Sequence, residues 1–239
     1  MGAPGPADLV LALDAGSPQV SVALGRGGEV LAARSEAIAR SSRRLLEMID
    51  EALAEAGVER EALRGIVALR GPGSFTGLRV GLATALGLHL ALGVPAAAVP
   101  TLLVLAASAG TRLREESASA PGDVILAAVD ALRGEWTVQP FAGDPPRALA
   151  EAETVPAADL AARGAAAIAG FGIAALAALP GWPAAREAPR LLAPGPLAPV
   201  AIDLLPRLAV DWDPALLTEP LYARPPAVIA PATPAAPRR

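Results

Sequence analysis

The sequence predicts an α/β protein of two lobes, each built on a mixed sheet flanked by helices. A unit of strand, aspartate, turn and strand occurs twice, in LVLALDAGSPQVSVAL from Leu9 and in VILAAVDALRGEWTVQPF from Val124. Helix and strand patterns alternate after each copy, which is typical of sheets covered by helices. The chain of 239 residues is 53% hydrophobic and 18% charged, a composition that supports a sizeable core.

The first half of the chain supplies the elements of the first lobe. Apolar runs bounded by turns predict strands, and apolar residues at helical spacing predict helices. Gly57 is expected to end the first helix, and Thr101 to cap the third. The predicted strands are Leu9–Leu13, Val20–Leu24, Glu29–Ser35, Ile66–Leu69 and Ala96–Val99, and the predicted helices are Ser41–Ala56, Phe75–Leu92 and the one that begins at Thr101.

The second half repeats this order less regularly, because 19 of the 25 prolines follow Ala120. The predicted strands are Val124–Val129, Trp136–Phe141, Ala148–Val155 and Ala166–Gly170, with a short helix at Ala157–Arg163 and a helix at Pro199–Leu208 that packs back on the body. We expect an N-terminal lobe over 1–105, a C-terminal lobe over 106–224 and a disordered, low-complexity tail over 225–239.

Missing residue types exclude several chemistries. The chain has no cysteine, so it has no disulfide and no thiolate nucleophile. All 20 basic residues are arginine, which excludes a P-loop lysine and Schiff-base chemistry. His89 is the one histidine, so a multi-histidine zinc site is excluded, and we expect His89 to be a helix residue with a local hydrogen bond. The net charge of −4 gives no basic field for nucleic acid.

A long uncharged stretch runs from Val80 to Thr111. Its length suggests a membrane span, but Gly93, Pro95 and Pro100 divide it into a helix, a strand and a second helix. We therefore expect it in a core and not in a membrane. The N-terminus lacks a basic segment of a signal peptide, so the expected location is the cytoplasm.

The stretch RGPGSFTGLRVGLATALG, Arg70 to Gly87, combines a glycine loop with a helix. One interpretation is an anion site. A strand is followed by the loop GPGS and then by a helix, whose first turn has free backbone N–H groups and the positive end of the helix dipole. Ser74 is the expected N-cap. The other interpretation is close packing, because Gly73, Gly77 and Gly81 share one helix face. That face could meet the chain's own sheet or another subunit. We expect the subunit, with Leu78, Leu82, Leu86 and Leu90 facing the home core.

Asp14 and Asp130 each end a strand and enter a turn. The segment Asp14–Ser17, DAGS, fits the phosphate-binding hairpin of sugar kinases and actin-like ATPases, so Asp14, Gly16 and Ser17 are candidate cofactor-binding residues. Two aspartates in a cleft could also hold metal ions for phosphodiester hydrolysis. The alternative is that each aspartate only forms its turn, and that Arg133 and Glu135 lie at an exposed hairpin tip.

The segment GPGSFTGLRVGLATALGLHLALGVP closely resembles the signature of the TsaB family, also called YeaZ, of tRNA threonylcarbamoyladenosine biosynthesis. Four further segments resemble the family's opening hairpin, first helix, D-A-R-R-G-E-V turn and P-L-Y-x-R-x-P ending, so that the resemblance runs from about Leu9 to Val228. These segments are LALDAGSPQVSVAL, RRLLEMIDEALAEAG, VDALRGEW and EPLYARPPAV.

The resemblance implies the two-lobed actin-like ATPase, or ribonuclease H-like, fold. It implies a non-catalytic scaffold without a cofactor of its own, which pairs with a TsaD-type paralog and is joined by a TsaE-type ATPase that uses ATP. It further implies dimer contacts, with the paralog or in a homodimer, through the glycine-motif helix, and tRNA contact only through the complex. The implied interface residues are Gly73, Ser74, Phe75, Thr76, Gly77, Arg79, Gly81 and Thr84.

Three positions depart from the family pattern: Ser41 stands where histidine is frequent, Glu47 replaces a proline, and Leu132 stands where arginine is usual. Two other functions stay open at this point. One is a stand-alone actin-like ATPase or small-molecule kinase that uses Asp14 and Asp130. The other is a peptidase, against which the lack of cysteine and of a metal site argues.

Overall fold

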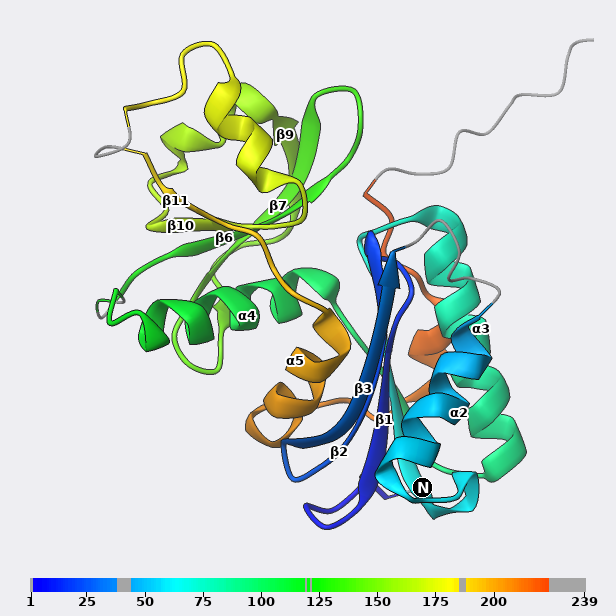
Figure 1. The fold of residues 1–239 in the computed structure, drawn as a ribbon. Coiled ribbons are helices and arrows are strands. Elements are labelled where there is room, and N and C mark those ends of the chain that lie inside the picture. The colour runs from blue at the N-terminus through cyan, green and yellow to red at the C-terminus, as the bar shows by residue number, and fades with distance from the viewer. Residues whose placement is uncertain (1, 38–43, 119, 121, 185–187, 224–239) are drawn as a thin grey trace, which may run out of the picture.

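Two lobes, each with its own sheet, make up the computed structural model (Figure 1). The structure describes residues 2–37, 44–118, 120, 122–184 and 188–223. The tail expected at 225–239 and the departure at Ser41 lie outside these residues.

The first sheet has the strand order β3-β2-β1-β4-β5. β2 is antiparallel to β1 and β3, whereas β4 and β5 run parallel to β1. The sheet is thus mixed, as predicted. Its strands are β1 (Leu9–Asp14), β2 (Gln19–Arg26), β3 (Glu29–Ala37), β4 (Leu63–Leu69) and β5 (Ala96–Val99).

The second sheet repeats this arrangement, because its order β11-β10-β6-β7-β8, with β9 also on β7, places a parallel pair beside an antiparallel hairpin. The predicted second use of one unit is confirmed. Its strands are β6 (Ile125–Asp130), β7 (Glu135–Ala142), β8 (Arg147–Ala148), β9 (Glu153–Pro156), β10 (Ala167–Ala169) and β11 (Arg190–Leu192).

The single strand predicted at Ala148–Val155 is wrong. β8 pairs with one end of β7 and β9 with the other. Pro140 lies in β7 between these two ladders. Since proline has no N–H to donate, the ladder breaks there, and the partner segment divides into two short strands.

In the described part of the chain, the α-helices form two layers around the first sheet (Figure 1). α2 (Leu45–Ala56) and α3 (Phe75–Leu92) cover one face and enclose a core with β1 and β4. α4 (Thr101–Glu115) and α5 (Leu197–Leu204) lie between the two sheets, in a second core that both lobes share. α4 packs on β6 and β10, and α5 packs on β1 and β2.

The chain returns to the first lobe after the second sheet. α5 lies against the first sheet, and the 3-10 helix η6 (Pro214–Thr218) packs on α3 and β5. The predicted packing of this region on the body is confirmed. Residues 197–218 thus pack with the first sheet, although the lobe boundaries predicted from the sequence place them in the C-terminal lobe, 106–224.

Short helical turns replace regular helices in the second lobe. The predicted helix at Ala157–Arg163 consists of two 3-10 turns, Ala157–Asp159 and Ala161–Arg163, and Gly164 in the left-handed region ends the second. A third 3-10 segment, Ile173–Ala178, lies between β10 and β11. These turns cover the outer face of the second sheet in a third, smaller core.

Helix ends follow the sequence signals except at α4. Gly57 caps α2 with φ of 64°, and the Ser74 hydroxyl accepts a hydrogen bond from the Gly77 N–H, as predicted. The residue before α4 is Pro100, so Thr101 is not its N-cap. His89 forms the expected local hydrogen bond, from Nδ1 to the carbonyl oxygen of Val94 at 2.7 Å.

α3 is 18 residues long with a mean hydropathy of 1.4, enough by length and composition to cross a bilayer. It instead forms one layer on the sheet, and the uncharged stretch divides into α3, β5 and α4 as predicted. Leu78 and Leu82 are buried and Leu86 is half-buried. Leu90, expected in the home core, is 72% exposed. The helix therefore keeps an apolar side chain on its outer face.

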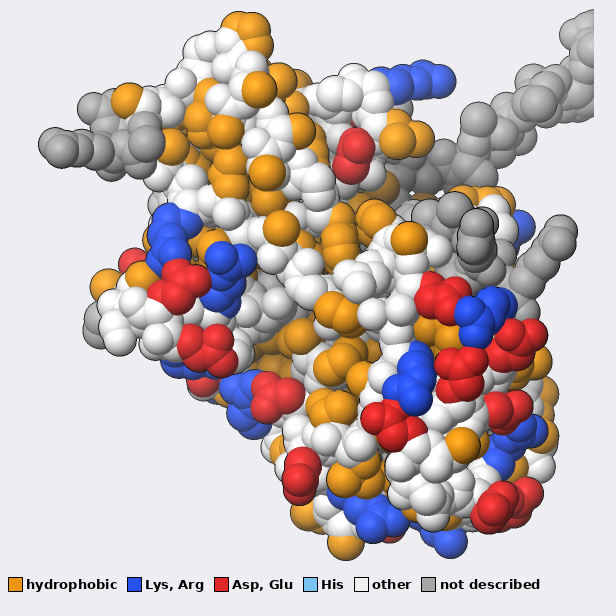
Figure 2. All heavy atoms as spheres, viewed as in Figure 1, with side chains coloured by type: hydrophobic (Ala, Val, Ile, Leu, Met, Phe, Trp, Pro, Cys, Tyr) orange, Lys and Arg blue, Asp and Glu red, His pale blue; other side chains and the backbone are white. Residues whose placement is uncertain are grey.

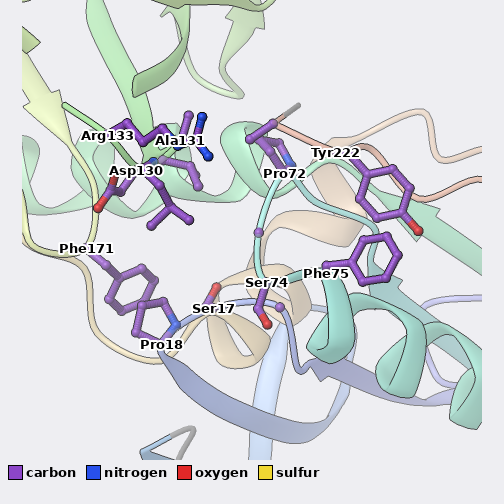
Figure 3. A pocket seen from close by; sticks show the side chains of 15 residues that line it. Ser17, Pro18, Pro72, Ser74, Phe75, Asp130, Ala131, Arg133, Phe171 and Tyr222 are labelled. Carbon is purple, nitrogen blue, oxygen red and sulfur yellow. Dashed lines mark hydrogen bonds between the residues drawn. The ribbon is translucent and has the colours of Figure 1, made fainter. Parts of the chain in front are cut away.

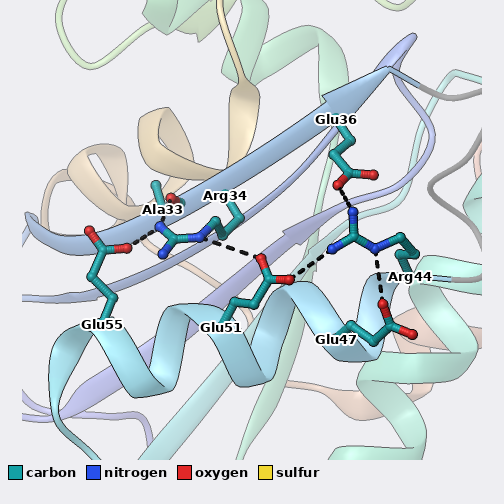
Figure 4. A network of polar contacts seen from close by, with 7 residues as sticks. All are labelled: Ala33, Arg34, Glu36, Arg44, Glu47, Glu51 and Glu55. Atoms are coloured by element: carbon teal, nitrogen blue, oxygen red, sulfur yellow. Dashed lines mark hydrogen bonds and ion pairs between the residues drawn. The ribbon is translucent and has the colours of Figure 1, made fainter.

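Two arginines and four glutamates form a network between β3 and α2 (Figure 4). Arg44 binds Glu36, Glu47 and Glu51, and Arg34 binds Glu51 and Glu55. These side chains are partly solvated, so each pair adds little stability. The face shown in Figure 2 mixes arginines with acidic side chains over α2, and this network carries an excess of negative charge.

Candidate functional site in the cleft between the lobes

Five segments from both lobes meet around a cavity of about 720 Å³ (Figure 3). They are the β1–β2 turn, the loop before α3, the β6–β7 turn, the residue Phe171 and the end of the described chain at Tyr222 and Ala223. Figure 3 shows Pro18 and Phe171 on one side of the cavity and Phe75 and Tyr222 on the other. The fold therefore brings the two predicted aspartate turns and the glycine motif to one place.

The lining of this cavity is mostly apolar. Its polar side chains include Ser17, Ser74, Asp130 and Arg133. The Asp130 carboxylate accepts a hydrogen bond from the Leu132 N–H at 2.7 Å, so Asp130 forms its turn as the simpler interpretation expects. Leu132 and Arg133 both adopt positive φ, 66° and 57°, which is uncommon for residues other than glycine. This turn presents Leu132 to solvent, 70% exposed.

Asp14 does not line the cavity, because its side chain is completely buried. Its Oδ1 accepts hydrogen bonds from the backbone N–H groups of Gly16 at 3.1 Å and Ser17 at 3.2 Å. Its Oδ2 has no hydrogen-bond partner among the described residues. Burial raises the pKa of Asp14 to about 6, against the opposing effect of the hydrogen bonds from Ser17 and Gly16. Gly16 and Ser17, the other candidate cofactor-binding residues, do line the cavity.

The glycine loop before α3 bonds to its own chain. The Gly71 N–H donates to Thr101 Oγ1 at 3.2 Å. The Thr101 hydroxyl thus holds the glycine loop and does not cap α4. The Ser74 N–H donates to the carbonyl oxygen of Gly16 at 2.8 Å. The Gly77 N–H donates to Ser74 Oγ. An anion loop needs such N–H groups to point at the ligand, so these bonds weaken the phosphate interpretation.

The glycine face of α3 packs on the β1–β2 turn of the same chain. A Cβ on Gly77 would lie 2.0 Å from the carbonyl oxygen of Ala15, and one on Gly73 would lie 2.7 Å from that of Gly16. A Cβ on Gly81 would lie 3.1 Å from Ala15 Cβ. The expectation that these glycines leave room for another subunit is wrong, since a backbone of the home chain fills that space.

Three of the predicted interface residues lie on the outer face of α3. Phe75, Thr76 and Arg79 are exposed, whereas Ser74 and Thr84 are half-buried. The outer face continues through further exposed residues at helical spacing, namely Ala83, Gly87, Leu90 and Ala91. Sequence reasoning missed Leu90 and Gly87, because glycine spacing alone does not reveal which face the sheet covers.

A magnesium–nucleotide group, which many proteins of actin-like fold bind, does not fit the described residues. Such a group needs carboxylate oxygens and N–H donors that face the ligand. Asp14 is buried, Asp130 bonds to its own turn, and the glycine loops bond to each other. In the part of the chain that the structure describes, no group of three or more histidine, aspartate or glutamate side chains could hold a metal ion.

Comparisons with known proteins agree with the fold and the motif. A family model described as TsaD, tRNA N6-adenosine threonylcarbamoyltransferase, matches residues 29–143. The tRNA threonylcarbamoyladenosine biosynthesis proteins TsaB of Escherichia coli (strain K12) and Haemophilus influenzae are each 35% identical to the chain over 126 residues. These alignments cover 53% of this chain and 52% and 50% of those proteins, so the chain spans about half the length of the curated relatives it matches.

Among solved structures, YeaZ from Pseudomonas aeruginosa superposes with a TM-score of 0.70 at 28% identity, over 90% of this chain and 99% of that one. Another structure, an uncharacterized protein with similarity to peptidase YeaZ from Pseudomonas aeruginosa, has a TM-score of 0.69 over 91% of this chain. The paired mixed sheets with helices between them define the two-lobed actin-like, ribonuclease H-like class. Within that class, the chain is similar to the TsaB (YeaZ) proteins in sequence and in structure.

Proposed function

We propose that this protein is a non-catalytic scaffold subunit of tRNA threonylcarbamoyladenosine biosynthesis that binds a TsaD-type transferase paralog. The observation that carries the proposal is the glycine motif itself, which forms α3 at the edge of the cleft and presents Phe75, Thr76 and Arg79 outward. Two relatives that are each 35% identical to the chain over 126 residues are named for this pathway. In this role the protein acts in the cytoplasm.

The cleft supports a non-catalytic role. Its candidate carboxylates form turns or lie buried, and the N–H groups of Gly16, Ser17 and Ser74 bond within the chain. The chain also lacks lysine and cysteine, and its one histidine bonds locally. ATP in the complex would therefore be used by other subunits, among them a TsaE-type ATPase.

The outer face of α3 is the surface we assign to the paralog. Phe75 is 42% exposed and Leu90 is 72% exposed, and small residues between them allow close approach of a partner helix. A second copy of this chain would use the same face in a homodimer. Since the network on α2 is acidic, tRNA contact is assigned to the complex and not to this chain alone.

Replacing Leu90 with arginine should weaken binding to the paralog at least tenfold, because a charge would be placed in an apolar contact, at a cost of about 1.4 kcal/mol or more. The measurement is capture of the purified paralog by immobilised chain, followed by titration calorimetry. Leu149→Arg is the matched control, since Leu149 is also exposed, at 56%, but lies in the second lobe. Equal affinities for the two variants would contradict the assigned surface.

The purified chain should not hydrolyse ATP above background, alone or with magnesium. The test is phosphate release over time, compared between the wild-type chain and the Asp130→Asn variant, because Asp130 is the carboxylate that lines the cleft. Turnover that the substitution abolishes would favour the alternative of a stand-alone ATPase or kinase of actin-like fold.

A further inference from the structure

The last described residues form a strap, defined here as Glu219–Ala223, that first binds the first lobe. The Leu221 N–H donates to the carbonyl oxygen of Arg70, the residue directly after β4, at 2.7 Å. The Tyr222 ring lies against the Phe75 ring with centroids 5.0 Å apart. Arg79 joins both, because its Nε donates to the Tyr222 hydroxyl at 3.2 Å and its guanidinium lies 4.0 Å from the Phe75 ring centroid.

The same strap then binds the second lobe. The carbonyl oxygen of Ala223 accepts hydrogen bonds from Thr137 Oγ1 at 3.4 Å and from Thr154 Oγ1 at 3.3 Å. These threonines lie on β7 and β9, and their hydroxyls are 3.1 Å apart. Tyr222 and Ala223 also line the cavity. The strap therefore crosses from one lobe to the other at the cleft.

The lobes meet elsewhere through α4 and α5. α4 belongs to the second sheet by its packing and α5 to the first, and the two helices pack on each other. Both helices contribute alanines to the shared core, Ala106 and Ala109 from α4 and Ala198 and Ala201 from α5. Small side chains at a helix contact permit a sliding adjustment with little steric cost. The strap is thus placed where it opposes such a movement.

We propose that the strap is a latch that holds the cleft closed and couples its opening to the first turn of α3. Tyr222 binds Phe75 and Arg79 on the first lobe, while the next residue binds both threonines on the second. A partner that engages Phe75 or Arg79 therefore changes the position of the strap and so the separation of the lobes. By thermodynamic linkage, a molecule that binds in the cleft changes the affinity of α3 for such a partner by the same factor. This inference concerns the isolated chain and does not depend on the proposed pathway.

Because the chain has no cysteine, two introduced cysteines would be its only thiols and could be labelled specifically. Leu46→Cys on α2 and Leu149→Cys between β8 and β9 place spin labels on exposed positions of different lobes. Distances between the labels are measured by pulsed electron resonance. The doubly labelled chain should give one narrow distribution. Adding Thr137→Val and Thr154→Val should produce a second population at a different distance, because the strap loses both donors from the second lobe.

One ordinary hydrogen bond shifts such an equilibrium about fivefold, so the two valines together should raise the ratio of open to closed molecules about 25-fold. Thr218→Val is the matched control, because the Thr218 hydroxyl donates within η6, to the carbonyl oxygen of Ala215, and contacts neither threonine of the second lobe. This variant should keep the narrow distribution. Thermal unfolding followed by circular dichroism confirms that each variant is folded.

The coupling is tested from the first lobe with Phe75→Ala and Tyr222→Phe. The first removes the ring partner of Tyr222, and the second removes only the hydroxyl that accepts from Arg79. Both should populate the same second distance as the threonine variants, Phe75→Ala more strongly. Folded variants with an unchanged distribution would overturn the latch. A change from the threonine variants alone would leave closure by the strap in place and overturn its coupling to α3.

Discussion

Replacing Gly77 with alanine should lower the melting temperature of the isolated chain by about 6 °C, whereas the same replacement at Gly87 should raise it slightly. A Cβ on Gly77 would lie 2.0 Å from the carbonyl oxygen of Ala15, a backbone atom that cannot turn away. Overpacking of this kind costs about 3 kcal/mol, which outweighs the gain in helix propensity of about 1 kcal/mol. Gly87 lies in the same helix, and a Cβ added there would have no atom within 4 Å. Alanine at this position therefore brings only the gain in helix propensity.

Thermal unfolding of the two variants and of Gly81→Ala checks this prediction. Gly81 should rank between them, because its added Cβ would meet the Ala15 methyl group at 3.1 Å, where a shift of a few tenths of an ångström relieves the contact. Sedimentation separates this effect from association. If Gly77→Ala kept its melting temperature and lost only a dimer, the glycine face would be a subunit contact after all.

The sequence predicted the order and type of most elements, because their signals are local. The bounds of α3 and β5 were predicted to the residue, since Ser74 and Gly93 carry the cap chemistry of α3 and prolines bracket the strand. The repeated strand–aspartate–turn unit predicted that two similar sheets form. The error at β8 and β9 came from one residue, Pro140 in the neighbouring strand, whose effect depends on which strand it pairs with.

Features that depend on the packing of distant segments were not predictable. Periodicity showed that Gly73, Gly77 and Gly81 share a face, but not that the β1–β2 turn fills it. Asp14 was recognised as a turn residue and a ligand candidate, and only the packed fold shows that its side chain is buried. The sequence of the strap resembles a family ending, but its contacts with Thr137 and Thr154 join residues far apart in the chain, which no local pattern indicates.

Replacing Asp14 with asparagine should remove a pH dependence of stability that the wild-type chain shows between about pH 4 and about pH 7. Burial raises the pKa of Asp14 to about 6 in the fold, from 3.8 for the free side chain. Because the folded pKa is the higher one, the contribution of Asp14 to stability is fully present below about pH 4 and is lost as the pH rises through about 6. The difference of about two pH units corresponds to ~3 kcal/mol between the limits.

The measurement is the free energy of unfolding in urea for the wild-type chain and for Asp14→Asn across this pH range. The difference between the two chains is taken at each pH, so that the contributions of the other carboxylates cancel. The wild-type chain should lose about 2 kcal/mol relative to Asp14→Asn between about pH 4 and about pH 7.5. At the acidic end the variant should be the less stable of the two, because its amide places an N–H₂ group where Asp14 Oδ2 has no described partner. Asp130→Asn is the matched control for the loss of a turn-forming carboxylate, since Asp130 forms the corresponding turn of the second lobe with an exposed side chain. Parallel profiles for Asp14→Asn and wild type would show that Asp14 is ionised in the fold, with a ligand or water at Oδ2, and the cleft would then have to be reconsidered as an ion site.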